Sequence, residues 1–136
     1  MEVLQSEDRE ETKITRFPYK GKNYDVKGVG VRWLSKTGED DSGQPEYGLR
    51  LFTVEPDGEI PTHNHFYVQT MYILSGRFTC WSSDPESGEV IQEKACGPGS
   101  TVYIPSMEPH GMRNESAREP GSFLCCICNV YPDDMI

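Results

Sequence analysis

The chain has 136 residues, of which 35% are hydrophobic, and its formal net charge is −9. This length supports one buried core and therefore one domain, and no apolar run approaches the about 18 residues of a membrane-spanning helix. The acidic charge argues against nucleic acid or an anionic membrane surface as a partner.

The first twelve residues are strongly acidic. Residues 1–12 carry five acidic side chains against one basic side chain, Arg9, which gives a net charge of −4. We expect this segment to be a disordered arm, or an arm that becomes ordered on a partner. It lacks the apolar stretch of a secretory signal peptide, which predicts a cytoplasmic protein.

Residues 13–136 contain short apolar stretches separated by Gly, Pro and Asp. Alternation of apolar and polar residues predicts about ten strands. They cover residues 13–19, 24–34, 47–55, 62–65, 69–74, 77–82, 89–94, 101–104, 110–114 and 122–131. Residues 35–46 are expected to form a polar loop, and Pro-Asp-Gly at 56–58 to end the third strand. Short strands at this spacing predict one all-β domain, an antiparallel sandwich or barrel.

The three histidines of the chain all lie beside turn signals. His63 and His65 are two residues apart, so on a strand they share a face, and Gln69 and Met71 keep the same parity. His110 begins a later strand. Imidazole is the commonest neutral metal ligand, and this spacing lets two rings converge on one ion. Structural or surface histidines are the alternative at this point.

The segments around these histidines resemble the two motifs of the cupin superfamily. DGEIPTHNHFYVQ at 57–69, followed by six residues and Gly76, matches Gly-(x)5-His-x-His-(x)3,4-Glu-(x)6-Gly. GSTVYIPSMEPHGMRN at 99–114 matches Gly-(x)5-Pro-x-Gly-(x)2-His-(x)3-Asn. The resemblance implies a single-domain cupin, that is, a double-stranded β-helix or jelly-roll barrel over residues 13–136. It also implies a homodimer and one divalent transition metal ion (Fe, Ni, Mn, Zn or Cu) bound by His63, His65, Gln69 and His110.

Three positions depart from these motifs. Asp57 occupies the first glycine position, with Gly58 beside it, and Met107 replaces the glycine before the second histidine. Gln69 stands where the family most often has a carboxylate. Three imidazoles and an amide leave a divalent ion its full charge, which strengthens it as a Lewis acid and disfavours Mg²⁺ and Ca²⁺. The alternative is that Gln69 is a buried amide beside a site of three histidines.

The resemblance leaves the reaction open, because one fold hosts many activities. We expect a metal-dependent enzyme that acts on a small anionic or oxygen-rich molecule. Dioxygenase chemistry with Fe, Ni or Cu is the first expectation, and isomerase or lyase chemistry with Zn, Mn or Ni is the second. The alternative is a non-catalytic module that binds or senses a metal or ligand.

Three charged residues are candidates for contacts with substrate. Arg50 and Arg32 lie on predicted strands and would clamp a substrate carboxylate if they face inward; solvent-facing positions suit them equally well. Glu108, two residues before the second-motif histidine, is the nearest candidate acid or base.

Five cysteines without a secretion signal indicate reduced thiols. Cys125 and Cys128 have Cys-x-x-Cys spacing, but within a predicted strand they point to opposite faces, unlike the redox motif at a helix start. Cys126 and Cys128 share a face, and a thiol near the metal would add a ligand or redox partner; small buried residues are the simpler interpretation. Six apolar residues are expected to fill the barrel: Phe52, Met71, Ile73, Val102, Ile104 and Met112.

Overall fold

The computed structural model describes residues 1–37 and 46–128. These residues form one short 3-10 helix, η1 (Ser6–Asp8), and nine strands. The strands are β1 (Thr12–Tyr19), β2 (Lys22–Thr37), β3 (Tyr47–His63), β4 (Val68–Ser75), β5 (Phe78–Ser83), β6 (Val90–Cys96), β7 (Thr101–Ile104), β8 (His110–Asn114) and β9 (Gly121–Cys128). Within the described residues, no helix is long and apolar enough to cross a membrane.

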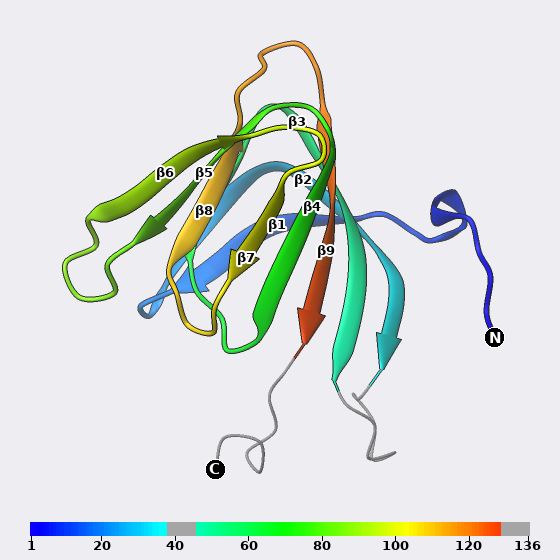
Figure 1. Ribbon diagram of the computed structural model, residues 1–136, viewed down its shortest axis with the longest axis horizontal. Coiled ribbons are helices and arrows are strands. Elements are labelled where there is room, and N and C mark those ends of the chain that lie inside the picture. Colours follow the sequence, from blue (N-terminus) through cyan, green and yellow to red (C-terminus); the bar gives the residue numbers. More distant parts are fainter. Residues whose placement is uncertain (38–45, 129–136) are drawn as a thin grey trace.

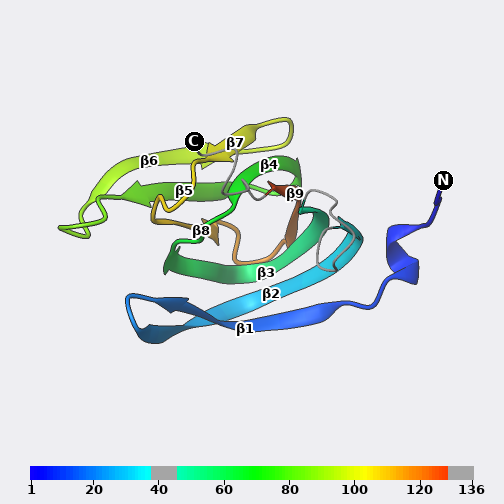
Figure 2. The same cartoon turned by 90° about the horizontal axis from the view of Figure 1, so that it is seen from below.

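All nine strands belong to one antiparallel sheet that curls into a nearly closed barrel (Figure 1). The hydrogen-bonded order is β6-β5-β8-β3-β9-β4-β7, and β2 joins the sheet along β3 and pairs with β1 on its other side. Figure 2 shows β1, β2 and β3 on one side of the barrel, with β4, β5, β6 and β7 on the opposite side. The predicted all-β jelly-roll barrel is therefore confirmed.

Strand β3 is the longest element and changes its partner along its length. Its first half pairs with β9 from Tyr47 to Val54, and its second half pairs with β8 from Glu59 to His63. Between the two halves the chain bulges. Lys27 on β2 pairs with Glu59 and Val29 pairs with Val54, so the four residues 55–58 of β3 lie opposite a single residue of β2, Gly28. The prediction that Pro-Asp-Gly at 56–58 ends a strand was wrong: the turn residues form a bulge inside one continuous strand.

The barrel interior is filled by alternate residues of the strands. On β3 the buried side chains include Phe52 and Val54, and on β9 they include Phe123, whose ring stacks on Phe52 with 4.9 Å between centroids. Phe78 on β5 meets Phe123 edge-on. Five of the six apolar residues expected inside are buried, namely Phe52, Met71, Ile73, Ile104 and Met112, and the sixth, Val102, packs against them.

The strand boundaries otherwise follow the sequence pattern closely. The strands expected at 101–104 and 110–114 have those bounds, and β2 runs past its expected end to Thr37. Most of the polar loop expected at 35–46 lies outside the described residues. The strand expected at 122–131 begins one residue earlier, at Gly121, and is described as far as Cys128.

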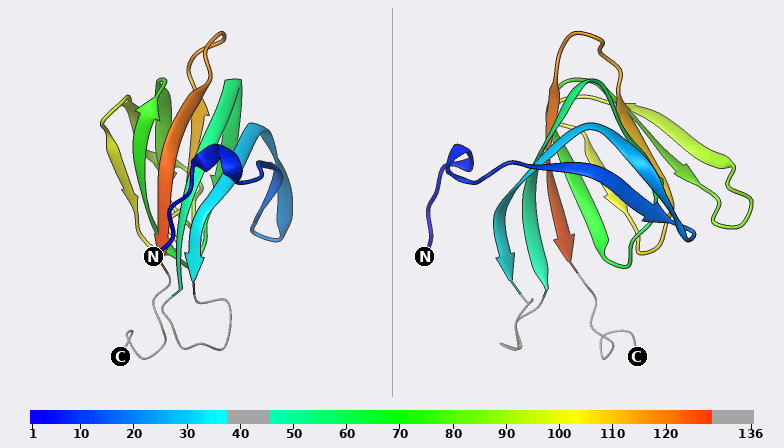
Figure 3. Two further views of the ribbon diagram at one scale, coloured as in Figure 1. Left: turned by 90° about the vertical axis from the view of Figure 1, so that its right-hand side faces the viewer. Right: turned by 180° about the vertical axis from the view of Figure 1, so that it is seen from behind.

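The N-terminal arm lies against β2. Figure 3 shows η1 outside the barrel, before β1 begins. The guanidinium of Arg32 on β2 donates to the carbonyl oxygen of Arg9 and lies 3.7 Å from the carboxylate of Glu11. Glu11 also covers Gly30, where any side chain would collide with it. These contacts join the arm to the barrel; that the arm becomes ordered on a partner stays a prediction.

Candidate metal centre

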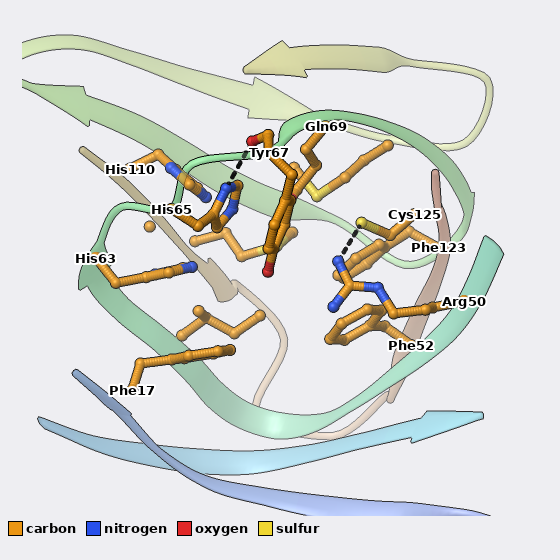
Figure 4. A pocket seen from close by; sticks show the side chains of 14 residues that line it. Phe17, Arg50, Phe52, His63, His65, Tyr67, Gln69, His110, Phe123 and Cys125 are labelled. Carbon is orange, nitrogen blue, oxygen red and sulfur yellow. Dashed lines mark hydrogen bonds between the residues drawn. The ribbon is translucent and has the colours of Figure 1, made fainter. Parts of the chain in front are cut away.

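Three histidine side chains converge inside the barrel (Figure 4). His63 ends β3 and lies opposite His110, the first residue of β8, while His65 follows two residues after β3. The centroid of the His110 ring is 4.4 Å from that of His63 and 4.8 Å from that of His65. One ring nitrogen of each histidine lies within 4.8 Å of the other two. The three residues are therefore positioned to bind one metal ion.

The backbone sets which nitrogen of each ring faces the centre. The Nδ1 atom of every one of the three rings lies 2.8–2.9 Å from a backbone carbonyl oxygen two residues away in the chain. Because a carbonyl only accepts, each Nδ1 carries the hydrogen, which leaves the lone pair on Nε2. The Nε2 atoms of His65 and His110 are buried and have no hydrogen-bond partner among the described residues.

Burial keeps the three imidazoles neutral. It lowers the pKa of His63 to about 4 and that of His110 to about 3, and it also lowers the pKa of His65. Mutual repulsion between the rings adds to this effect, and the hydrogen bonds to carbonyls oppose it. The neutral ring is the form that binds a metal ion, so no proton has to leave these rings at neutral pH.

Gln69 on β4 lies beside the histidines. Its side chain is 7% exposed and lines the same cavity, and its amide is close enough to His65 to raise that histidine's pKa. Met71, two residues along the strand, also faces inward, as the parity predicted. That the carbonyl oxygen of Gln69 is a fourth ligand stays a prediction.

The donor set suits a divalent transition metal. Two buried Nε2 atoms without partners are polar groups that an ion would satisfy, because buried polar atoms are normally bonded. Three neutral nitrogens favour iron, nickel, copper or zinc, whereas magnesium and calcium require oxygen ligands. Manganese also prefers oxygen donors and suits this set less well.

The cavity around the histidines is narrow and largely apolar. About 20 Å³ of it is wide enough for water, room for little more than one molecule. Phe17 stacks on the His63 ring with 4.3 Å between centroids, and Tyr67 stacks on the His65 ring at 3.9 Å. The remaining apolar side chains of the wall come from Phe52, Ile60, Met71, Met112 and Phe123.

Arg50 faces this cavity from β3. Its side chain is 7% exposed, and Nη2 donates to Sγ of Cys125 over 3.0 Å (Figure 4). Its Nε atom has no hydrogen-bond partner in the part of the chain that the structure describes. Its guanidinium lies 4.8 Å from the centroid of the Phe52 ring. Within residues 1–37 and 46–128, no carboxylate forms an ion pair with it. A buried cation without an anion is costly, so this position favours an anionic ligand.

The other two charged candidates lie elsewhere. Arg32 does not line the cavity, because Glu11 and the carbonyl oxygen of Arg9 hold its guanidinium outside the barrel. Glu108 does not line the metal cavity. It lines a cleft of about 300 Å³ between β5, β6 and β7 that adjoins the cavity at Met71, His110 and Gly111, and its carbonyl oxygen accepts from Nδ1 of His110. Glu108 belongs to a loop, so the parity of a strand does not carry its side chain to the histidine face.

Several residues of the cavity were not assigned to it from the sequence, among them Phe17, Tyr67 and Cys125. Phe17 comes from β1, and no local pattern links it to the histidines. Tyr67 lies between β3 and β4, outside the strands whose alternation predicts the direction of a side chain. Cys125 is the cysteine that faces the cavity, whereas Cys126 is half-buried and Cys128 exposed. Once Phe123 is taken as interior, strand parity would have pointed to Cys125.

Fold and site together define a small β-barrel domain with a candidate metal site of three histidines. The family model described as a cupin domain matches residues 50–127, which is more than half of the chain. The chain therefore belongs to the cupin domain family. No curated protein matches it.

Solved structures show the same fold. The polyketide cyclase RemF of Streptomyces resistomycificus is 26% identical with a TM-score of 0.70, and the match covers 97% of this chain and 82% of that one. An RmlC-like cupin of Shewanella frigidimarina is 16% identical with a TM-score of 0.68, covering 98% and 95%. An oxalate decarboxylase of Bacillus subtilis is 17% identical with a TM-score of 0.66, covering 93% of this chain and 29% of that one.

Proposed function

We propose that this protein is a metal-dependent enzyme that acts, without net oxidation, on a small oxygen-rich molecule able to form an enolate. The observation that carries the proposal is the pairing of two features in one cavity. Three neutral imidazoles, each held through Nδ1, bring one ring nitrogen apiece within 4.8 Å of the others, and beside them lies a buried arginine with no described anionic partner. The first feature suits a metal ion, and the second suits a negatively charged oxygen.

A divalent ion held by His63, His65 and His110 would supply Lewis acidity toward an oxygen that gains negative charge. The chain itself contributes hydrogen-bond donors and an apolar cavity that excludes water. The guanidinium of Arg50 and the hydroxyl of Tyr67 line the same cavity and can donate to that oxygen. The apolar walls keep water away, which strengthens these interactions.

A redox-neutral reaction is favoured by the neutral donor set and by the structural likeness. Because His63, His65, Gln69 and His110 carry no negative charge, the ion would keep its full charge for the substrate oxygen. RemF, at 26% identity, is a polyketide cyclase. Dioxygenase chemistry, the first expectation from the sequence, becomes the competing outcome, and a sensor without turnover is the other.

The test begins with metal-free protein reconstituted separately with Zn, Mn, Ni, Fe(II) and Cu(II). Each form is incubated with β-diketones, β-keto acids and hydroxylated aromatic acids, with and without oxygen, and products are followed by mass spectrometry. We expect the zinc form to turn over at least one substrate without oxygen. The control variant Arg32→Gln should match the wild type, and His63→Ala should be inactive.

Turnover confined to iron, nickel or copper and dependent on oxygen would replace the proposal with dioxygenase chemistry. Saturable ligand binding without any product, for every metal, would replace it with the sensor.

A further inference from the structure

A second hollow lies directly outside the metal cavity. It is about 300 Å³ in volume, at the small end of the range for ligand pockets. Two residues, Arg50 and Tyr67, line both this hollow and the metal cavity, so they form the boundary between them. We call the outer hollow the vestibule; its described lining is Trp33, Lys36, Thr37, Glu46, Tyr47, Arg50, Tyr67, Ile127 and Cys128.

The two hollows differ so much in volume that a bound molecule would place only a small part of itself in the inner cavity. The inner cavity has about 20 Å³ wide enough for water, against about 300 Å³ in the vestibule. A few atoms, such as a single oxygen-bearing group, would fill the inner space. The rest of a substrate whose reactive group reaches the histidines therefore lies outside the inner cavity. The cleft at Met71, His110 and Gly111 also adjoins this cavity, but the buried cation Arg50 lines the vestibule and not that cleft, which favours the vestibule for an anionic molecule.

The wall of the vestibule is aromatic where it meets the inner cavity. The Arg50 guanidinium lies 5.3 Å from the ring centroid of Trp33 and 5.9 Å from that of Tyr67. Tyr47, at the rim, is partly exposed. Flat rings offer a large contact area to another flat ring at little entropic cost, and they do so less well for a puckered or branched chain.

The boundary between the two hollows is cationic. Arg50 is 93% buried, since 7% of its surface is exposed, and its Nε atom has no partner among the described residues. The rings of Trp33 and Tyr67 surround this cation without neutralising it. An anionic group placed beside Arg50 would gain charge-assisted hydrogen bonds, and a flat body attached to it would extend over the aromatic wall.

We propose that the vestibule binds the flat aromatic or conjugated body of the substrate, with its anionic group at Arg50. This inference rests on the proposed function for the metal, but the vestibule itself needs no metal to bind. The ligand class is therefore an aromatic monoanion with a carboxylate, phenolate or enolate oxygen.

The two tryptophans of the chain allow a direct test on the metal-free protein. Trp33 lines the vestibule, whereas Trp81 lines the cleft between β5, β6 and β7 that holds Glu108. Protein labelled with 5-fluorotryptophan gives two fluorine resonances, which the variant Trp81→Phe assigns. The probe is 2-naphthoate, and we expect saturable movement of the Trp33 resonance with that of Trp81 unchanged.

Two matched probes separate charge from shape. Decahydro-2-naphthoate keeps the charge but is not flat, and 2-naphthamide is flat but neutral. Each should bind about tenfold more weakly than 2-naphthoate, the loss expected for one stacking or one charge-assisted contact. Equal binding of all three probes, or movement of the Trp81 resonance instead, would overturn the inference.

Variants complete the test. Arg50→Gln should weaken 2-naphthoate roughly 10- to 100-fold and leave 2-naphthamide unchanged, because only the charge-assisted bonds are lost. Arg32→Gln, the matched arginine outside the barrel, should bind like the wild type. If Arg50→Gln does not fold, Trp33→Leu replaces it, with binding measured by isothermal titration calorimetry because this variant lacks the Trp33 resonance; it should weaken 2-naphthoate more than decahydro-2-naphthoate. Unchanged binding in these variants refutes the vestibule site.

The outcomes for metal and vestibule are separable. Binding of 2-naphthoate without turnover by any metal form leaves the vestibule in place and removes the proposed enzyme. Turnover by the zinc form, together with no movement of the Trp33 resonance on addition of these probes, supports the proposed enzyme and refutes the vestibule site.

Discussion

The two halves of β3 differ in partner and in chemistry, and the phase of the strand changes within the second half. The half from Tyr47 to Val54 pairs with β9 and turns its even-numbered residues inward, among them the cation Arg50. The half from Glu59 to His63 pairs with β8 and reaches the metal site through an odd-numbered residue. The phase changes through a register shift between Ile60 and His63.

This difference teaches that one strand can carry two binding functions when an irregularity resets its phase. In an uninterrupted strand, positions 50 and 63 would face opposite sides of the sheet, because thirteen residues separate them and side chains alternate. Bulges are sites where a side chain is redirected. The irregular register of β3 therefore brings an anion-binding residue and a metal-binding residue into one cavity.

The largest expected effect is on metal affinity, and it should appear for a variant in the second half of β3 but not for one in the first half. His63→Ala should lower metal affinity by at least about 100-fold, because it removes one of three imidazole donors. Arg50→Gln should keep the wild-type metal content, since the guanidinium is not a ligand. Elemental analysis after dialysis, with chelator competition for affinity, measures both. Equal metal content in His63→Ala and wild type would mean that β3 supplies no ligand.

The junction between the halves is the next test. Asn114 is 3% exposed, and its Nδ2 donates to the carbonyl oxygens of Val54 and Glu55, where β3 leaves one partner for the other. Asn114→Ala should cost about 3 kcal/mol of unfolding free energy, roughly 10 °C in Tm. Asn23→Ala, at an exposed position, should change stability by less than about 0.5 kcal/mol. Urea and thermal unfolding followed by circular dichroism measure both; similar losses would refute a role for the junction.

A smaller effect concerns Gln69, the predicted fourth ligand, which lies on β4 beside the histidines. Gln69→Glu should raise metal affinity by about tenfold and shift the preference toward Mn²⁺, because a carboxylate adds charge and a hard oxygen donor. Competition titrations with several metals measure this change, and Met71→Leu on the same face is the control. Unchanged selectivity would make Gln69 a neighbour of the site and not a ligand.

The smallest effect lies outside the barrel, beyond both halves. Arg32→Gln removes a partly exposed ion pair with Glu11 and the bond to the Arg9 carbonyl, which should cost at most about 1 kcal/mol. Amide exchange in residues 9–11 should become faster, while metal content stays that of the wild type. A loss of metal in this variant would reconnect Arg32 to the cavity.

Much of the fold and of the metal site could be predicted from sequence because both depend on local spacing. His63 and His65 are two residues apart, and the motifs that hold them and His110 also predicted the jelly-roll barrel. Parity carried Gln69 and Met71 to the correct face. The metal identity, the homodimer and the cytoplasmic location stay predictions.

The remaining features depend on events that local spacing does not encode. Pro56, Asp57 and Gly58 have turn chemistry, but pairing with β2 on either side makes them a bulge. Glu108 is close to His110 in sequence, yet it lies on a loop and lines the cleft between β5, β6 and β7 instead of the metal cavity. Phe17 reaches the cavity only because β1 folds back along β2, which is a matter of tertiary packing.

The carbonyl oxygens that accept from the three Nδ1 atoms have a consequence for how this protein can evolve. A carboxylate side chain, a backbone carbonyl or a water can orient a metal-binding histidine, and replacing a side chain that does so damages the metal site. Here the main chain does so, and every residue type provides a carbonyl. Substitutions in the surrounding walls can therefore change which molecule is accepted while the ligand geometry persists. Selection for a new substrate can act on this barrel without first rebuilding its centre.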